Sequence, residues 1–134
     1  MTISNNFMKT IVQDYHINAS IEKVWQALTN AKEIEEWGAG PAEMDENMST
    51  KFSLWGGDIH GTNIEVEKFK KLVQEWYFED WHEPSIVTFK LTKQKEFTKL
   101  ELLHENVPDE EYEDIDEGWK EYYLGPLKKY LESQ

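Results

Sequence analysis

The C-terminal stretch of this sequence decides the fold, and residues 108–132 read PDEEYEDIDEGWKEYYLGPLKKYLE. Apolar and aromatic side chains recur in it every three or four residues, which is the spacing of one face of a helix. They are Ile115, Trp119, Tyr122, Tyr123, Leu127 and Tyr130. Asp109 is placed to act as the N-cap, because its carboxylate can accept a free amide of the first turn. Pro126 predicts a kink near residues 124–126, since proline has no backbone donor.

One strand and two short helices are predicted at the N-terminal end of the chain. Residues 10–17 are rich in β-branched and aromatic side chains, which favour a strand. Ser20 is a good N-cap for a short helix whose apolar residues follow at helical spacing. Thr29 or Asn30 caps a second short helix, and Glu33 is spaced to complete a capping box with Asn30.

The middle of the chain, from Met44 to about Asn106, has the alternating pattern of strands. Beyond a first hairpin, strands are predicted at residues 71–78, 85–92 and 97–105. Each places alternate apolar side chains on one face. Several antiparallel strands in succession predict a curved meander.

The pair Gly56–Gly57 is a hairpin signal, because the favoured two-residue turn needs positive φ at both positions. Such a turn pairs Leu54 with Ile59. Ile64 has the opposite parity from Ile59, so a one-residue bulge near Gly61 is predicted to return Ile64 to the inner face.

The order of these elements predicts an α+β fold. The sheet must cover one face, and the C-terminal helix is the only long amphipathic element available to do so. We therefore expect a curved antiparallel sheet wrapped around that helix, with two short helices after the first strand. A concave sheet and a straight helix do not fit perfectly, so a cavity is expected between them. By length, residues 1–134 form one domain.

Composition and charge exclude several classes of function. The chain has 27 acidic residues against 14 basic ones, all lysine, for a formal charge of −13. Nucleic acids and anionic membranes are poor partners for such a surface, because phosphate recognition uses positive charge and arginine forks. The absence of cysteine excludes disulfides and thiolate chemistry. No apolar run is long enough to span a membrane, and Met1–Thr10 lacks the features of a secretory signal, so a cytoplasmic protein is expected.

A series of short motifs, in this order and spacing, resembles that of one known family. The motifs are residues 20–29 (SIEKVWQALT), 55–61 (WGGDIHG), 71–76 (KLVQEW), 102–108 (LLHENVP) and 118–119 (GW) with 126–131 (PLKKYL). The family is named for the activator of the heat-shock protein 90 ATPase. It belongs to the superfamily of START lipid-transfer and birch-pollen-allergen-like domains. The resemblance covers about residues 10–132 and implies the helix-grip fold, a ligand cavity and, as an alternative function, a chaperone partner.

The main functional hypothesis is a non-enzymatic binding protein that holds an apolar or amphipathic small molecule between the sheet and the C-terminal helix. An apolar pocket with a few polar groups is the usual form of such a site. The predicted lining is Trp37, Phe52, Leu54, Ile64, Trp76, Phe78, Val87, Phe89, Leu102, Trp119 and Tyr123. The alternative is that these residues fill a solid core. The loop 38–41 and the kink at Pro126 are the predicted gates of the cavity.

His104 is the polar residue of most interest, because alternation places it on the same face as Leu102. It could orient a ligand, as could Tyr122 or Tyr123, or it could act as a base. We favour a core histidine bonded to the backbone or to Tyr123, because a lone histidine lacks the partner that catalysis needs. No catalytic residue is assigned, and a cyclase or hydrolase of small aromatic compounds, as among some superfamily relatives, is the third hypothesis.

No metal site and no cofactor are expected. The remaining histidines, His16, His60 and His82, are scattered and lack the spacing of metal ligands. The acidic run at residues 109–117 lacks the glycine and the alternating ligands of a calcium loop, and a solvated helix start explains it. Glu65 is predicted to point to solvent, which counts against paired catalytic carboxylates. Motifs for phosphate and dinucleotide binding are also missing.

Overall fold

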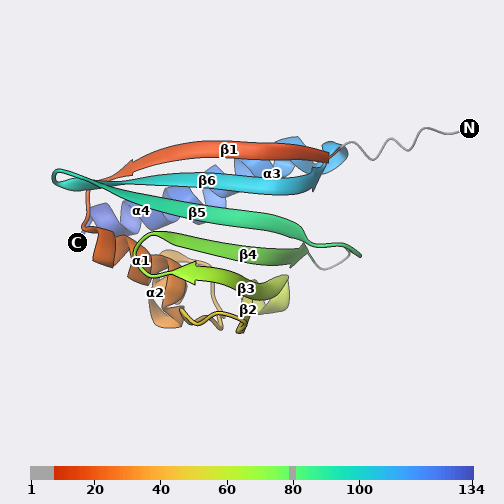
Figure 1. The fold of residues 1–134 in the computed structure, drawn as a ribbon, viewed down its shortest axis with the longest axis horizontal. Coiled ribbons are helices and arrows are strands. Elements are labelled where there is room, and N and C mark those ends of the chain that lie inside the picture. Colours follow the sequence, from red (N-terminus) through yellow and green to blue (C-terminus); the bar gives the residue numbers. More distant parts are fainter. Residues whose placement is uncertain (1–7, 79–80) are drawn as a thin grey trace, which may run out of the picture.

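The computed structural model describes residues 8–78 and 81–134, and its centre is a six-stranded antiparallel sheet (Figure 1). The strands are β1 (Met8–Ile17), β2 (Lys51–Leu54), β3 (Ile59–Glu67), β4 (Lys71–Phe78), β5 (Ser85–Gln94) and β6 (Phe97–Pro108). They lie in the order β1-β6-β5-β4-β3-β2. The chain therefore runs as a meander from β2 to β6, and β1 completes the sheet beside the last strand. Most of the segment predicted to lack a secretory signal lies outside the described residues.

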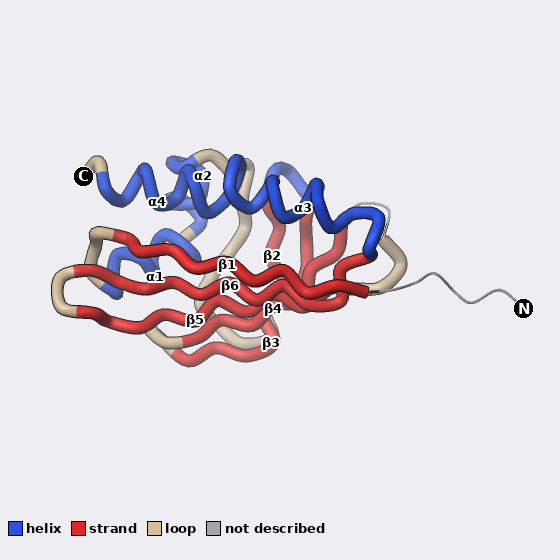
Figure 2. The backbone as a smooth tube through the Cα atoms, turned by 90° about the horizontal axis from the view of Figure 1, so that it is seen from above, coloured by secondary structure: helices blue, strands red, loops and turns tan. Residues whose placement is uncertain are grey.

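Helices lie on one side of this sheet. The N-terminal pair is α1 (Ile21–Thr29) and α2 (Ala31–Trp37). The C-terminal segment consists of a 3-10 turn (Asp109–Glu111), α3 (Tyr112–Gly118), a π-turn (Trp119–Tyr123) and α4 (Leu124–Glu132). Figure 2 shows α3 and α4 running one after the other along the sheet, with the strands near β2 bending toward them. The predicted α+β, helix-grip fold is confirmed.

The caps of the two short helices agree with the sequence pattern in part. The Ser20 hydroxyl accepts the Lys23 amide at 3.2 Å, and the Asn30 side chain accepts the Glu33 amide at 3.1 Å. The second half of the predicted capping box is wrong. The Asn30 amide already donates to the last turn of α1, and the Glu33 carboxylate instead accepts the Tyr130 hydroxyl of α4 at 2.7 Å.

The hairpin register is confirmed, but the bulge lies further along β3 than predicted. Leu54 pairs with Ile59, and both Gly56 and Gly57 have positive φ. The register shift falls between residues 63 and 65, so Ile64 is the extra residue and is 40% exposed. The prediction that Ile64 points inward is therefore wrong.

Two close contacts explain why the bulge lies beyond Gly61. A Cβ at Gly61 would lie 1.7 Å from the Glu75 carbonyl oxygen, so this glycine allows β3 and β4 to approach each other in regular pairing. Asn63 is fully buried and its side-chain amide donates to the carbonyls of Asp45 and Asn47 at 3.0 and 3.2 Å. These bonds hold Asn63 on the inner face, and the following residue is displaced outward.

The start of the C-terminal segment is held by an ion pair rather than by a cap. Asp109, the predicted N-cap, lies inside the 3-10 turn and pairs with Lys9 of β1 at 2.9 Å. Neither this turn nor α3 has a side-chain cap. The prediction failed because β6 continues through Pro108 and the chain enters the helix through a tighter turn.

A helix kink was predicted near residues 124–126. The helix is irregular about one turn earlier, where the π-turn Trp119–Tyr123 interrupts it. Within it, the Leu124 amide donates to the Trp119 carbonyl, which is the wider bonding pattern of a π-helix. Pro126 cannot donate to the carbonyl four residues before it and its ring crowds that carbonyl, so the preceding turn widens. Gly125 fits this turn because a Cβ there would lie 1.9 Å from the Lys120 carbonyl oxygen.

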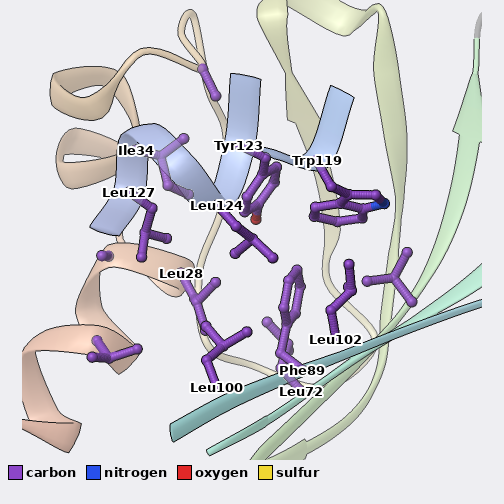
Figure 3. Close-up of a cluster of buried hydrophobic side chains, with 14 of the residues drawn as sticks. Leu28, Ile34, Leu72, Phe89, Leu100, Leu102, Trp119, Tyr123, Leu124 and Leu127 are labelled. Carbon is purple, nitrogen blue, oxygen red and sulfur yellow. The ribbon is translucent and has the colours of Figure 1, made fainter. Parts of the chain in front are cut away.

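The core lies between the concave face of the sheet and the helices. Figure 3 shows Leu124 and Leu127 of α4 pointing toward Phe89 and Leu100 of the sheet, with Leu28 of α1 beside them. All five side chains are fully buried. The α4 half of the segment is thus the part that the sheet grips most closely.

Candidate functional site

A cleft of about 280 Å³ lies between the sheet and the first half of the C-terminal segment. The sheet contributes residues at the junction of β2 and β3 and at the end of β4, and the opposite wall is α3 with the π-turn. The lining residues are Trp55, Ile59, Trp76, Phe78, Asp114, Ile115, Gly118, Trp119, Tyr122 and Tyr123. Asp114 is the one carboxylate among them. The volume is close to the lower end of ordinary small-molecule sites.

The cleft exists because α3 packs less closely than α4. No residue of α3 is buried, whereas α4 buries Leu124, Leu127 and Leu131. Gly118 adds no side chain at the centre of the wall. The π-turn then directs Trp119 and Tyr123 toward the sheet, as Figure 3 shows.

The predicted lining residues fall into three groups. Five of them line the cleft, namely Trp76, Phe78, Trp119, Tyr122 and Tyr123. Seven are buried core residues that are not part of its wall, namely Trp37, Phe52, Leu54, Val87, Phe89, Leu102 and His104. Ile64 is on the outer face, as described above. The solid-core alternative is therefore correct for the deeper part of the space between sheet and helix.

Sequence reasoning missed five residues of the cleft: Trp55, Ile59, Asp114, Ile115 and Gly118. Two of them carried a usable signal. Ile115 belongs to the apolar stripe of the predicted helix, and Ile59 pairs with Leu54 on the inner face of the hairpin. Nothing in the local pattern of Asp114 distinguishes it from the other carboxylates of the acidic run.

Stacked aromatic rings form the floor of the cleft. The rings of Trp76 and Trp119 stack with centroids 4.8 Å apart and planes at 29°. Tyr123 lies 4.7 Å from Trp119 and 5.9 Å from Trp76. Because each ring contacts the others, their positions are fixed before any ligand enters.

Hydrogen bonds turn the three indole N–H groups of the cleft toward protein acceptors. Trp119 Nε1 donates to His104 Nδ1 at 2.9 Å and Trp76 Nε1 donates to Gln74 Oε1 at 2.8 Å. Trp55 Nε1 donates to the Gly38 carbonyl at 3.1 Å. The indole N–H groups are therefore not free to donate to a molecule in the cleft.

His104 anchors this arrangement from within the core. Its Nδ1 accepts from Trp119, so the proton of the neutral ring is on Nε2, which donates to the Ser85 hydroxyl at 2.7 Å. Burial lowers the pKa of His104 to about 3, so the ring is neutral near pH 7. The expected core role is supported, although its partners are Ser85 and Trp119 rather than Tyr123 or the backbone. With both nitrogens engaged, the ring has no free site for acid–base chemistry on a ligand.

A second buried chain of hydrogen bonds supports Trp76. Gln74 accepts from Trp76 and donates to Asn63 Oδ1 at 2.8 Å. Asn63 in turn holds the loop around residues 45–47 through its own donor bonds. Buried polar groups that are satisfied in this way give a unique arrangement, so both indoles of the floor have fixed orientations.

The Tyr123 hydroxyl is buried and has no hydrogen-bond partner among the described residues. Burial raises the pKa of Tyr123, so the phenol remains protonated. In Figure 3 its oxygen points down from the helix toward the sheet, beside Leu124. An unpaired donor at this depth costs about 1–3 kcal/mol.

In residues 8–78 and 81–134, no group of three or more histidine or acidic side chains could hold a metal ion. Over the same part of the chain, no helix combines the length and apolarity that crossing a membrane requires. Glu65 is half-exposed and pairs with Lys71, so it faces solvent as predicted.

Comparison with known proteins gives the family. The family model described as "Activator of Hsp90 ATPase homolog 1-like protein" matches residues 18–132. The chain belongs to this family. The resemblance inferred from the sequence motifs is therefore confirmed.

Individual relatives agree with this assignment. The "Activator of 90 kDa heat shock protein ATPase homolog" of Dictyostelium discoideum is 27% identical over 124 residues, which are 90% of this chain and 32% of that protein. The human "Activator of 90 kDa heat shock protein ATPase homolog 1" is 26% identical over 112 residues, covering 82% of this chain and 33% of that protein. The chain thus spans about a third of the length of these curated relatives.

A solved structure has the same fold. The crystal structure of an HSP90 activator from Plasmodium falciparum superposes with a TM-score of 0.85 at 29% sequence identity. The match covers 92% of this chain and 96% of that one. Its extent places the sheet and the C-terminal segment in the same arrangement in both proteins.

Proposed function

We propose that this protein is a non-enzymatic binding module whose cleft holds a small apolar or amphipathic molecule. The observation that carries the proposal is the cleft of about 280 Å³, walled by aromatic rings whose indole N–H groups are all bonded to the protein. A preformed, mostly apolar concavity with few polar groups is the usual form of a small-molecule site. We expect this activity in the cytoplasm.

Rigidity and size further support this function. The rings of the floor are held by mutual stacking and by buried hydrogen bonds, so little side-chain entropy is lost when a ligand binds. A volume of about 280 Å³ suits a small molecule, or the apolar end of a larger one. His104 acts in this proposal by fixing Trp119, not by contacting the ligand.

Binding of a neutral aromatic probe tests the proposal. Phenylnaphthylamine should increase its fluorescence on binding and should quench indole emission. Ile115→Trp fills the cleft and should weaken this binding by at least about tenfold, which is about 1.4 kcal/mol. Val12→Trp is the matched control, because Val12 is 67% exposed on β1 and is not part of the cleft. Equal affinity in both variants and the parent would contradict the proposal.

A second candidate function is interaction with the heat-shock protein 90 ATPase. The family match over residues 18–132 favours it, as do relatives named as activators of that ATPase. The test is the ATPase turnover rate of the chaperone with increasing amounts of this protein. A change in turnover that saturates supports the function, and no change at saturating concentration contradicts it. Ile115→Trp distinguishes the two functions, because it should affect a chaperone interface only if the cleft forms part of it.

A further inference from the structure

We propose that the cleft selects organic cations, namely an ammonium group attached to an aromatic or aliphatic body. This inference rests on the proposed function and specifies the ligand class of the same site. It is carried by the chemistry of the walls, by the charge at the rim and by the lack of a lysine in the lining.

The walls of the cleft suit a cation because they offer aromatic faces. The faces of tryptophan and tyrosine rings carry negative electrostatic potential and attract ammonium groups. Trp76 and Trp119 stack on each other and are buried beneath the cleft, so the rings open to a ligand are those of Trp55 and Phe78, which are partly exposed. The ring of Tyr122, at 63% exposure, stands at the rim. Since the indole N–H groups are bonded elsewhere, the three indoles present no donor that would favour an anion.

The rim adds negative charge on the same side. Asp114 lines the cleft, is exposed, and makes no ion pair among the described residues. Glu110, Glu111 and Glu117 follow or precede it within one helical turn. An ammonium group at the mouth would lie near Asp114 while its apolar body contacts the floor.

Two lysines of the elements around the C-terminal segment are engaged in ion pairs. Lys9 pairs with Asp109 at 2.9 Å, and Lys120 pairs with Asp116 at 3.7 Å. Asp116 also accepts from Gln13 of β1 at 2.8 Å, which places that ion pair on the β1 side of the segment. No lysine belongs to the described lining of the cleft, so no protein cation competes with a ligand there.

The net charge of the whole chain also favours cations over anions. A formal charge of −13 attracts cations to the surface and repels anions. This long-range attraction weakens with salt, whereas contact between an ammonium group and a desolvated ring depends less on salt. The two contributions can therefore be separated by measuring affinity at two ionic strengths.

Three probes with the same body and different charge test the inference: phenylbutylamine, phenylbutanol and phenylbutyrate at pH 7. Their dissociation constants follow from quenching of indole fluorescence or from calorimetry. We expect the amine to bind at least about tenfold more tightly than the carboxylate, with the alcohol between them.

Variants assign the selectivity to the cleft. Asp114→Asn should weaken binding of phenylbutylamine by about threefold to tenfold and change the affinity for phenylbutanol by no more than about twofold. Asp14→Asn makes the same change in net charge at an exposed position of β1 and should leave all three affinities within about twofold. Tyr122→Leu removes an exposed ring and should reduce the advantage of the amine over the alcohol.

The outcomes separate this inference from the proposed function. If the three probes bind equally, or if Asp14→Asn and Asp114→Asn act alike, selection of cations by the cleft is overturned while binding in the cleft stands. If none of the probes binds, the proposed function fails and the inference fails with it. The predicted order of affinities, together with its loss in Asp114→Asn alone, supports both.

Discussion

The two helices of the C-terminal segment, α3 and α4, have similar lengths but very different packing. α4 buries three leucines and contacts α1, α2 and β1, whereas α3 buries no residue and contacts mainly β1 and the turns that flank it. The π-turn between them changes the direction of the side chains. The difference shows that one half of the segment holds the fold together and the other half leaves room for the cleft.

The largest expected difference in the free energy of unfolding is between truncation of one apolar side chain in α4 and truncation of one in α3. Leu127→Ala should lower the free energy of unfolding by about 2–5 kcal/mol, because Leu127 is fully buried. Ile115→Ala removes a side chain that is only partly buried and should cost about 1 kcal/mol or less. Urea unfolding of both variants measures the difference. Equal losses would contradict the division of the segment into a core half and a cleft half.

Alanine substitution at two glycines tests the π-turn itself. Gly125→Ala should destabilise the protein by about 1–3 kcal/mol, because the new Cβ would collide with the Lys120 carbonyl at 1.9 Å. Gly118→Ala is the matched control: its Cβ would meet only Tyr122 at 3.9 Å, and alanine is the better helix former by about 0.8–1.0 kcal/mol. The two substitutions should therefore have opposite signs in thermal unfolding. Stabilisation by both would mean that the π-turn is not needed.

His104 anchors the π-turn to the sheet, and its protonation should make the stability of the protein depend on pH. Burial lowers the pKa of His104 from 6.5 to about 3, so below pH 6.5 the unfolded chain binds a proton that the folded chain does not. Stability contributed by neutral His104 is complete above pH 6.5 and falls by about 1.4 kcal/mol per pH unit as the pH drops toward 3.

NMR titration of the His104 imidazole measures this pKa directly. The His104 signals should not titrate above about pH 5, given a pKa of about 3. A titration midpoint near 6.5 would show that the ring is accessible, and the assigned role of His104 as a neutral anchor would be wrong. The difference in unfolding free energy between the parent and His104→Leu should also shrink between pH 7 and pH 5.

Local chemistry predicted much of the fold from the sequence. Ser20 and Asn30 cap their helices because a cap needs only one side chain and one nearby amide. The register of the first hairpin follows from Gly56 and Gly57, whose positive φ values set the turn. Alternation also located β4 at residues 71–78. These features depend on residues close in sequence, so a sequence pattern can record them.

The errors concern features that distant contacts decide. The bulge moved beyond Gly61 because the loop carbonyls of Asp45 and Asn47 hold Asn63 inside, which exposes Ile64. Alternation likewise predicts which face a side chain occupies but not whether the space above it is filled. For this reason Phe89 is a core residue, while Trp76 on the neighbouring strand lines the cleft.

The smallest expected effect on stability compares two tyrosine hydroxyls, that of Tyr122 in the π-turn and that of Tyr130 in α4. Tyr130 of α4 donates to the Glu33 carboxylate of α2 at 2.7 Å, and this bond raises the pKa of Tyr130. Tyr130→Phe should cost about 0.5–1 kcal/mol, the usual net value of one hydrogen bond. Tyr122→Phe should cost nothing measurable, because the Tyr122 side chain is 63% exposed at the rim of the cleft.

Because the folded-state pKa of Tyr130 is raised above 10, the stabilisation by its bond is complete below pH 10 and declines as the pH rises further. Chemical denaturation of both variants at pH 7 checks the contrast, and a loss of similar size in Tyr122→Phe would mean that the cleft half of the segment is bonded as closely as the core half.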